Sequence, residues 1–422
     1  MKNRNSFFIN IFLFFSTLLI LLFAVGCDQS VKISNSPPSI NSLETSACHI
    51  VKGGTVHLQA TADDDDGDAL SYSWKATGGS FSNKSDNGAQ IDWTSPGQPG
   101  TFVITLSVTD QIDVANKSIS IEVCEKFPTS MSRDTTIVYE GYDYILTNSS
   151  KFVVQAGLTL TLGPGVKVLV NSEFGGFDVY GTLIVNGTKE SPVRISANAC
   201  TPVEGLWEGI GFSGSPARGE LRHLEVSFAT NGIFFEKRSA GTLLDCAIFN
   251  NDGTGLVVTD QGSSVEIRGC KIWDNFKGVY VRNADLAASN STIRYNASNG
   301  VEINVTDPSL VSVTIDSCVV ANNEENGFLL TNSACPSIHR CSIFSNGLDT
   351  NGYAVKLSSY NGTEDIHAEN NFWGLLENPE TDIPATIYDK ADDAAIGAFV
   401  VYEPWLTSPP VSLGLGLNGR VR

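Results

Sequence analysis

The sequence predicts an all-β protein in which a β-sandwich precedes a parallel β-helix. Two observations lead to this fold class. Short alternating segments separated by turn-forming residues fill residues 39–125, which is typical of a sandwich. Between residues 221 and 374 one pattern recurs seven times, at intervals of 21 to 28 residues and with no helical periodicity. Near-periodic short strands indicate a solenoid, so we expect a β-helix over residues 130–374.

The repeat is clearest in three columns of residues. Aliphatic residues or Ala come three positions before a mostly Cys column, and Asn comes five positions after most of its members. Equivalent residues of successive coils stack about 4.8 Å apart. We expect the aliphatic and Cys columns to form the core, as packed thiols or as disulfides between successive coils. We expect the Asn column to be a structural turn ladder. The central members are Cys246, Cys270, Ser291, Cys318 and Cys341, and Asn251, Asn275, Asn296, Asn323 and Asn346.

The first 26 residues have the pattern of an export signal. Lys2 and Arg4 precede an apolar run that ends in small residues just before Cys27. This pattern resembles the lipobox of bacterial lipoproteins, with Ala24 where that family usually has Leu. The resemblance implies cleavage before Cys27 and its acylation, palmitate included, which would anchor the protein to a lipid bilayer. An ordinary signal peptide or an N-terminal membrane helix is the alternative.

The charge and composition of the chain exclude one class of binding partner and indicate where the protein is located. The chain has 27 Lys and Arg against 46 Asp and Glu, a net charge of −19, which becomes −21 once the two basic residues of the leader are removed. Such a surface repels nucleic acid, so we expect no nucleic-acid partner. Residues 27–38 are polar and contain Pro37 and Pro38, as in a tether. We expect an extracytoplasmic protein, on the outer membrane or cell surface rather than the inner membrane.

Residues 66–74, 99–101 and 106–110 resemble a PKD-type immunoglobulin-like domain. The resemblance implies a sandwich with Trp74 in its core that serves as a spacer or binding module and has no catalytic role. Cys48 and Cys124 lie near the two ends of this domain, and we predict that they form a disulfide.

An acidic run within this domain raises the question of calcium. Hard cations prefer clustered carboxylates, although the bidentate Glu of an EF-hand is missing because position 74 is Trp. An exposed acidic turn is the alternative, and a thermal melt that is the same in calcium and in chelator would reject the metal. The candidate ligands are Asp63, Asp64, Asp65, Asp66 and Asp68.

Residues from about 145 to 407 resemble right-handed β-helix proteins of the pectin-lyase-like superfamily. The segments that carry the resemblance are 181–188, 191–195, 207–212, 370–374 and 387–406. Together with the PKD-type resemblance, it implies an immunoglobulin-like sandwich followed by a right-handed parallel β-helix. It implies no single activity, because this architecture hosts lyases, hydrolases, epimerases and non-catalytic adhesins.

Two sets of outward residues are candidates for function. Asp316, His339 and His367 lie two positions before the Cys column, where a carboxylate beside two imidazoles can transfer protons or hold a metal; a solvated stripe of mixed charge is the alternative. A second set is apolar and can bind sugar rings if exposed. We expect the tail, residues 375–413, to pack over this second set and cover it. Its members are Phe234, Val257, Tyr280 and Leu329.

The function expected from these features is non-catalytic glycan binding or adhesion at the cell envelope. The lyases that the β-helix resembles use an acidic calcium cluster with a basic residue, and the glycosidases use several Asp with His-containing motifs; neither set is found. A polysaccharide lyase or glycoside hydrolase on the outer face is one alternative, although no pair among Glu220, Glu266 and Asp316 is distinguished. A purely structural envelope protein is the other.

Overall fold

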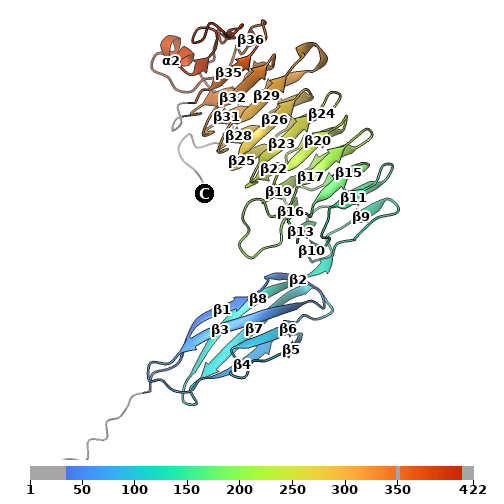
Figure 1. Cartoon of the computed structure of the whole chain (residues 1–422), viewed down its shortest axis with the longest axis vertical. Helices are drawn as coiled ribbons and strands as arrows, with labels where there is room; N and C mark the ends of the chain where they lie inside the picture. The colour runs from blue at the N-terminus through green and yellow to red at the C-terminus, as the bar shows by residue number, and fades with distance from the viewer. Residues whose placement is uncertain (1–34, 348–351, 411–422) are drawn as a thin grey trace, which may run out of the picture.

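A computed structural model describes residues 35–347 and 352–410 (Figure 1). The predicted leader, the lipidation site at Cys27, most of the tether and residues 411–413 of the tail lie outside these ranges. Within them, no helix is long and apolar enough to cross a membrane. The described chain is a β-sandwich followed by a stack of parallel β-coils, so the predicted fold class is confirmed.

The sandwich consists of two sheets of short alternating strands. The side chains that face inward pack into an apolar core in which Leu58, Trp93 and Ile104 are fully buried. Trp74, which the PKD resemblance places in the core, is only partly buried, and its indole Nε1 donates to the carbonyl of Gly88 at 2.9 Å. The strands of one sheet are β1 (Ser39–Thr45), β3 (Thr55–Asp63), β6 (Gln90–Thr94) and β5 (Ser80–Ser82), and those of the other are β4 (Ser71–Ala76), β7 (Gly100–Thr109), β8 (Val114–Lys126) and β2 (His49–Val51).

The solenoid is built from three parallel sheets, each of which takes one strand from successive coils. The first sheet contains β9 (Thr135–Ile137), β12 (Thr159–Leu162), β15 (Thr182–Asn186), β18 (Arg218–Arg222), β21 (Ala240–Leu244), β24 (Ser264–Arg268), β27 (Asp285–Ser289), β30 (Val313–Asp316) and β33 (Ser337–His339). The second contains β10 (Tyr144–Leu146), β13 (Lys167–Val170), β16 (Val193–Ala197), β19 (Leu224–Ser227), β22 (Ala247–Phe249), β25 (Lys271–Trp273), β28 (Thr292–Arg294), β31 (Val319–Ala321) and β34 (Ser342–Phe344). The third contains β11 (Phe152–Val154), β14 (Phe177–Val179), β17 (Ile210–Ser213), β20 (Ile233–Glu236), β23 (Thr254–Thr259), β26 (Lys277–Arg282), β29 (Val301–Val305), β32 (Phe328–Asn332), β35 (Val355–Tyr360) and β37 (Ile387–Tyr388).

The two domains share a sheet. Strand β8 of the sandwich pairs in parallel with β10 of the first coil, so the second sheet of the β-helix continues into the sandwich. Directly after β8, Phe127 is buried in the solenoid core and packs edge-on against Phe152 and Phe177. The last residues of the sandwich are therefore also the first residues of the solenoid.

The Asn column forms a buried ladder at the corner between the second and third sheets. Each of four amide Nδ2 groups donates to the Oδ1 of the next Asn, at distances from 2.8 to 3.1 Å. A buried amide is costly unless its donors and acceptors are satisfied, and stacking identical residues satisfies them coil after coil. The members are Asn251, Asn275, Asn296, Asn323 and Asn346.

The Cys column lies in the core as predicted, and its four cysteines are free thiols that form no disulfide between successive coils. The predicted disulfide between Cys48 and Cys124 is wrong. Cys48 is bonded to Cys200, with their Cα atoms 5.3 Å apart. Cys124 instead packs against Ile145 and Leu169 at the junction of the two domains, where it is buried and free. Its side chain on β8 faces the solenoid, whereas Cys48 meets a solenoid loop.

The described part of the tail closes the C-terminal end of the β-helix. Strand β37 adds to the edge of the third sheet beyond β35, and β36 (Ile366–His367) pairs with β38 (Val400–Val401). Helix α2 (Pro379–Ala385) packs Ile383 into the core, and the short 3-10 helix η1 (Pro308–Leu310) lies in a loop further back. The tail thus extends the stack and protects its last edge. The expectation that it covers the apolar outer residues is wrong, because those from Phe234 to Leu329 remain partly exposed.

Candidate functional site

The outer face of the first sheet carries a polar trough along β15, β18, β21 and β24. Strand alternation places Leu221, Leu243 and Ile267 in the core and turns their neighbours outward. The outward side chains enclose a hollow of about 470 Å³. Because the strands are in register, like positions form rows that run along the solenoid axis. The outward lining residues are Asn186, Arg218, Glu220, Arg222, Thr242, Leu244, Ser264 and Glu266.

The charged side chains in and beside this trough are unpaired. Arg218, Arg222 and Arg268 are exposed, as are Glu220 and Glu266, and no hydrogen bond or ion pair engages any of the five side chains in the described structure. Charged side chains elsewhere on the β-helix do form ion pairs. On the second sheet, for example, Arg194 Nε lies 2.6 Å from Glu225 Oε2. A guanidinium carries five donors in a fixed fork, so three unpaired arginines offer many bonds to a ligand.

The register brings Asp316 and His339 together as neighbours on β30 and β33. They continue the row that contains Arg222, Leu244 and Arg268. The Oδ2 atom of Asp316 accepts from Arg340 Nη2 at 2.6 Å, while its Oδ1 atom is buried without a partner. The ring Nδ1 of His339 lies 3.1 Å from the backbone carbonyl of Glu369. Each side chain is therefore already held by a neighbour outside the predicted trio.

His367 lies on β36, outside the first sheet. Its Nδ1 is 2.9 Å from Glu369 Oε1, and this hydrogen bond with a carboxylate raises the pKa of His367. Among the described residues, no hydrogen bond or ion pair joins His367 to Asp316 or to His339. Asp365 is occupied as well, because its Oδ1 accepts the backbone N–H of Phe399 and so fixes the tail. The predicted cluster is thus two neighbours and one separate His–Glu pair.

Comparison with known proteins agrees with this architecture. Residues 169–343 and 278–383, which together span just over half of the chain, match the family described as "Right handed beta helix region". The chain belongs to this right-handed β-helix family. Residues 48–123 match a family whose description names a PKD domain. No curated protein matches.

Several solved structures are similar to parts of this chain. The A-module of the mannuronan C-5 epimerase AlgE4 from Azotobacter vinelandii is 18% identical over 56% of this chain and 70% of that one, with a TM-score of 0.40. Pectate lyase Pel9A is 15% identical over 60% of this chain and 71% of its own, with a TM-score of 0.32. A nucleoside hydrolase-related hypothetical protein from Saccharophagus degradans is 26% identical with a TM-score of 0.18, over 23% of this chain, which spans 28% of that protein.

The apolar residues predicted to bind sugar lie in one row on the third sheet of the β-helix. Phe234, Val257 and Tyr280 are consecutive, but Glu302 separates Tyr280 from Leu329. All are half-buried. Two lysines screen the row. Lys151 Nζ lies 5.6 Å from the centre of the Phe234 ring, and Lys277 Nζ lies 5.5 Å from that of Tyr280 and 2.7 Å from Glu302 Oε2. The row is therefore interrupted and partly capped by charge, unlike a continuous apolar binding strip.

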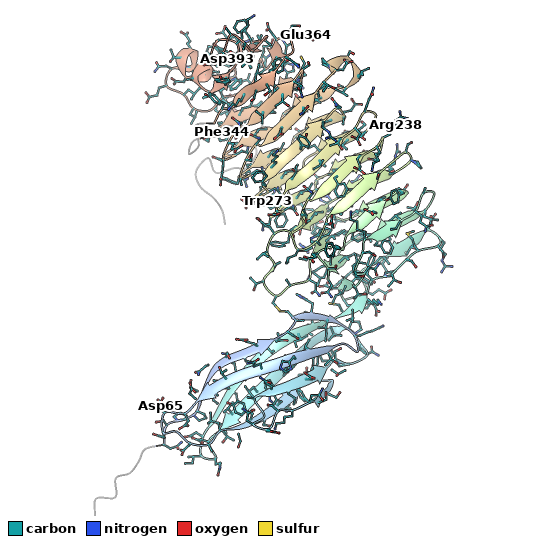
Figure 2. All side chains as sticks on the ribbon, viewed as in Figure 1. Asp65, Arg238, Trp273, Phe344, Glu364 and Asp393 are labelled. Carbon is teal, nitrogen blue, oxygen red and sulfur yellow. A yellow bond between two sulfur atoms is a disulfide. The ribbon has the colours of Figure 1, made fainter. Side chains whose placement is uncertain are left out.

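The acidic run lies at the tip of the sandwich farthest from the β-helix, where Figure 2 labels Asp65. Ligand oxygens of Asp64, Asp66 and Asp68 lie within 4.8 Å of one another. The Oδ1 atom of Asp64 accepts the backbone N–H groups of Asp66 and Asp68, which folds the turn. Asp63 is drawn away, because its Oδ2 accepts from Asn41 Nδ2 at 2.6 Å. Three of the five candidates are brought together, and calcium binding stays a prediction.

The three arginines of the trough were not singled out from the sequence. The sequence contained a clue to two of them, because Arg222 and Arg268 occupy the same outward-facing column as Asp316 and His339. The sequence places them on one face but cannot show that they lack acidic partners, since a partner can come from any neighbouring coil or loop.

Proposed function

We propose that this protein binds a glycan along the polar trough of its β-helix without cleaving it, and that it does so at the cell envelope. The observation that carries the proposal is a set of unpaired charged side chains in and beside one hollow. Arg218, Arg222, Glu220 and Glu266 line the hollow, and Arg268 lies beside it as the neighbour of Leu244. Sugar hydroxyl and carboxylate groups accept hydrogen bonds from guanidinium groups, and carboxylates accept from hydroxyls. A polymer that lies along the axis meets a similar row of groups coil after coil.

The surroundings of the predicted proton-transfer residues support binding rather than catalysis. A general base needs a free lone pair within reach of the substrate proton. The Oδ2 atom of Asp316 accepts from Arg340, and its unpartnered Oδ1 atom is buried away from solvent. Each of the two histidines uses its Nδ1 atom in a contact with Glu369. These contacts fix the side chains as parts of the scaffold at the C-terminal end of the first sheet.

The placement at the envelope rests on the resemblance of the leader to a lipoprotein signal and on the geometry of the sandwich. The described chain begins at the tip of the sandwich farthest from the β-helix (Figure 1). There Asn35 Nδ2 donates to Asp110 and Asp113, and the Ser36 N–H donates to Asp66. A lipid on Cys27 would therefore leave the sandwich as a spacer, with the β-helix held away from the membrane surface. Fractionation of cells and mass spectrometry of the N-terminus test this arrangement.

A glycan array tests the binding function. The full chain is compared with the double variant Arg222→Ala/Arg268→Ala and with Arg133→Ala, an exposed arginine of the first coil that serves as control. Loss of two charged hydrogen-bonding groups is expected to lower affinity at least tenfold, at about 1.5–3 kcal/mol for each bond. The control keeps its affinity. A protein that binds no glycan in a broad panel, or a double variant that binds as well as the parent, contradicts the proposal.

One observation favours a second function, glycoside hydrolysis. Glu220 and Glu266 face outward in the same row with Thr242 between them, so two strand spacings separate their backbones, about 9.6 Å. Inverting glycosidases hold their two carboxyl groups about 6.5–9.5 Å apart. If reducing ends appear in a polysaccharide panel and vanish in both Glu220→Gln and Glu266→Gln, the protein is a hydrolase; unsaturated products would instead indicate a lyase.

A further inference from the structure

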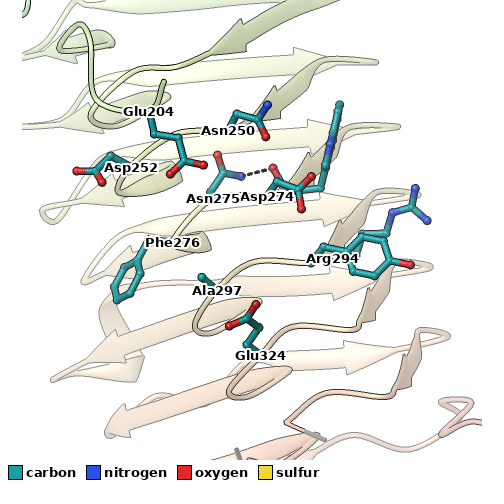
Figure 3. Close-up of a pocket in the computed structure, with 11 residues that line it drawn as sticks. Glu204, Asn250, Asp252, Asp274, Asn275, Phe276, Arg294, Ala297 and Glu324 are labelled. Atoms are coloured by element: carbon teal, nitrogen blue, oxygen red, sulfur yellow. Dashed lines mark hydrogen bonds between the residues drawn. The ribbon is translucent and has the colours of Figure 1, made fainter. Parts of the chain in front are cut away.

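A second groove lies at the corner between the second and third sheets, outside the Asn ladder (Figure 3). It has a volume of about 480 Å³. Its walls come from two sources: the turns that follow β22, β25, β28 and β31, and the loop of residues 198–209 between β16 and β17, which contributes Glu204. The lining side chains that matter are Glu204, Asp252, Trp273, Asp274, Phe276, Arg294, Tyr295 and Glu324.

The Asn ladder fixes the geometry of this groove. Each ladder Asn follows a residue in the left-handed region, with φ of 54° at Asn250, 51° at Asp274 and 55° at Tyr295. This sharp turn buries the Asn amide and directs the residues on either side of it outward. Because the ladder amides are hydrogen-bonded from coil to coil, the floor under the groove is rigid and repeats at the strand spacing.

Three aromatic side chains line the groove, of which Trp273 and Tyr295 are half-buried and Phe276 is exposed. Trp273 stacks on Phe249 with ring centres 4.4 Å apart and an angle of 7° between the planes, so the stack holds the Trp273 indole in place at the wall of the groove. Phe276 is 50% exposed at the next turn position. Tyr295 lies under the Arg294 guanidinium, 5.1 Å away. Flat, partly exposed rings provide the apolar contact area on which the C–H faces of sugar rings can pack.

The charge of the groove is strongly negative. Four carboxylates line it, those of Glu204, Asp252, Asp274 and Glu324, against the single guanidinium of Arg294 among the described lining residues. Burial first, and then the charges of Asp252 and Asp274, raise the pKa of Glu204. A positive group placed among these side chains would relieve their mutual repulsion, whereas a uronate or a phosphate would add to it.

We propose that this corner groove binds a glycan whose sugars carry protonated amino groups, such as a polymer of glucosamine. Aromatic side chains contact the sugar rings, and the carboxylates of Glu204 and Asp252 bind the ammonium groups. The groove is separate from the trough of the first sheet and opposite to it in character, because the trough offers unpaired guanidinium groups. This inference is independent of the function proposed for the trough, and variants of one surface leave the other unchanged.

Calorimetric titration of the full chain with chitosan oligomers and with their fully N-acetylated counterparts tests the proposal. The variants are Trp273→Ala and the double variant Glu204→Gln/Asp252→Asn. Their matched controls are Phe174→Ala, which removes an aromatic that is 62% exposed elsewhere, and Glu190→Gln, an exposed carboxylate on another turn. We expect each groove variant to lower chitosan affinity at least tenfold, the controls to leave it unchanged, and affinity to fall as salt is raised.

Three results would overturn the proposal. Equal affinity for the acetylated oligomers would show that the amino group is not recognised. If the parent protein does not bind chitosan, the groove is not a binding site for this class of glycan. Tighter binding of oligolysine, lost in the same variants, would identify the partner as a basic peptide instead of a glycan. Far-UV circular dichroism and thermal unfolding of every variant keep a folding defect distinct from a loss of binding.

Discussion

Cys48 in the sandwich is disulfide-bonded to Cys200 in a loop of the β-helix, across 152 residues of sequence. The bond lies beside the sheet that β8 and β10 already share, and Asn198 Nδ2 of the same loop contacts the backbone carbonyl of His49 at 3.5 Å. Four residues further on from Cys200, the loop contributes Glu204 to the wall of the corner groove. The two domains are thus joined both by backbone pairing and by a covalent link at one side of the junction.

Replacing Cys200 by Ala is expected to destabilise the protein by about 2–5 kcal/mol, because the bond closes a long loop in the unfolded chain. Denaturant unfolding with and without the substitution measures the effect. Cys335→Ala, which removes a free, half-buried thiol, is the control and should change stability far less. Peptide mapping without reductant should recover Cys48 linked to Cys200; recovery of Cys48 linked to Cys124 would contradict the structure.

The thiols of the Cys column are expected to resist alkylation in the native state. Burial raises the pKa of Cys246 and of Cys341, and the thiolate is the reactive form. Cys335 is the least buried of the free cysteines in the described chain, so it should be modified first. Timed treatment with iodoacetamide followed by peptide mapping gives the order. Modification of Cys246 before Cys335 would show that the core opens more readily than its packing implies.

Substituting one central Asn of the ladder should lower the stability of the protein much more than the loss of one small side chain would. Asn296 accepts from Asn275 and donates to Asn323, so Asn296→Ala leaves buried polar groups on two neighbouring coils without partners. We expect a loss of about 2–5 kcal/mol in the free energy of unfolding. The exposed Asn186→Ala on β15 is the control and should stay within about 0.5 kcal/mol. Similar melts for both variants would refute a structural role for the ladder.

The His367–Glu369 pair should make a small contribution to stability that depends on pH. The hydrogen bond with Glu369 raises the pKa of His367 in the folded state, so the contribution is fully present below the unfolded pKa, about 6.5, and is lost as pH rises through the folded value. The ring is mostly exposed, so solvent screening keeps the effect small. Titration by NMR should show a raised pKa that returns toward 6.5 in Glu369→Gln; an unchanged pKa in that variant would exclude the pair as its cause.

The residues that repeat were predictable, whereas the residues of the two proposed binding sites mostly do not repeat from coil to coil. The positions of Cys246 and Asn275 follow from the period alone, because a coil that stacks on its neighbour must place the same side chain at the same depth. His367 was predicted to continue the row of Asp316 and His339, but it lies on β36, which pairs with β38 and not with β33. The spacing of the earlier coils does not hold there, because Asn371 takes the place beside Cys341 that Cys341 takes beside Cys318. The tail was assigned to the wrong surface for a related reason: apolar residues reveal that burial is needed but not where it occurs.

By itself the sequence determined the sandwich, the β-helix and the inward columns, since strand alternation and coil spacing are local properties that stacking repeats. Tertiary structure decided which thiol pairs with Cys48, which arginines remain unpaired, and which carboxylates share a groove. Glu204 meets Asp252 and Asp274 only because the loop that carries it folds back over later coils. Such contacts join segments that do not share a repeat, so they cannot be predicted from the spacing of residues in the sequence.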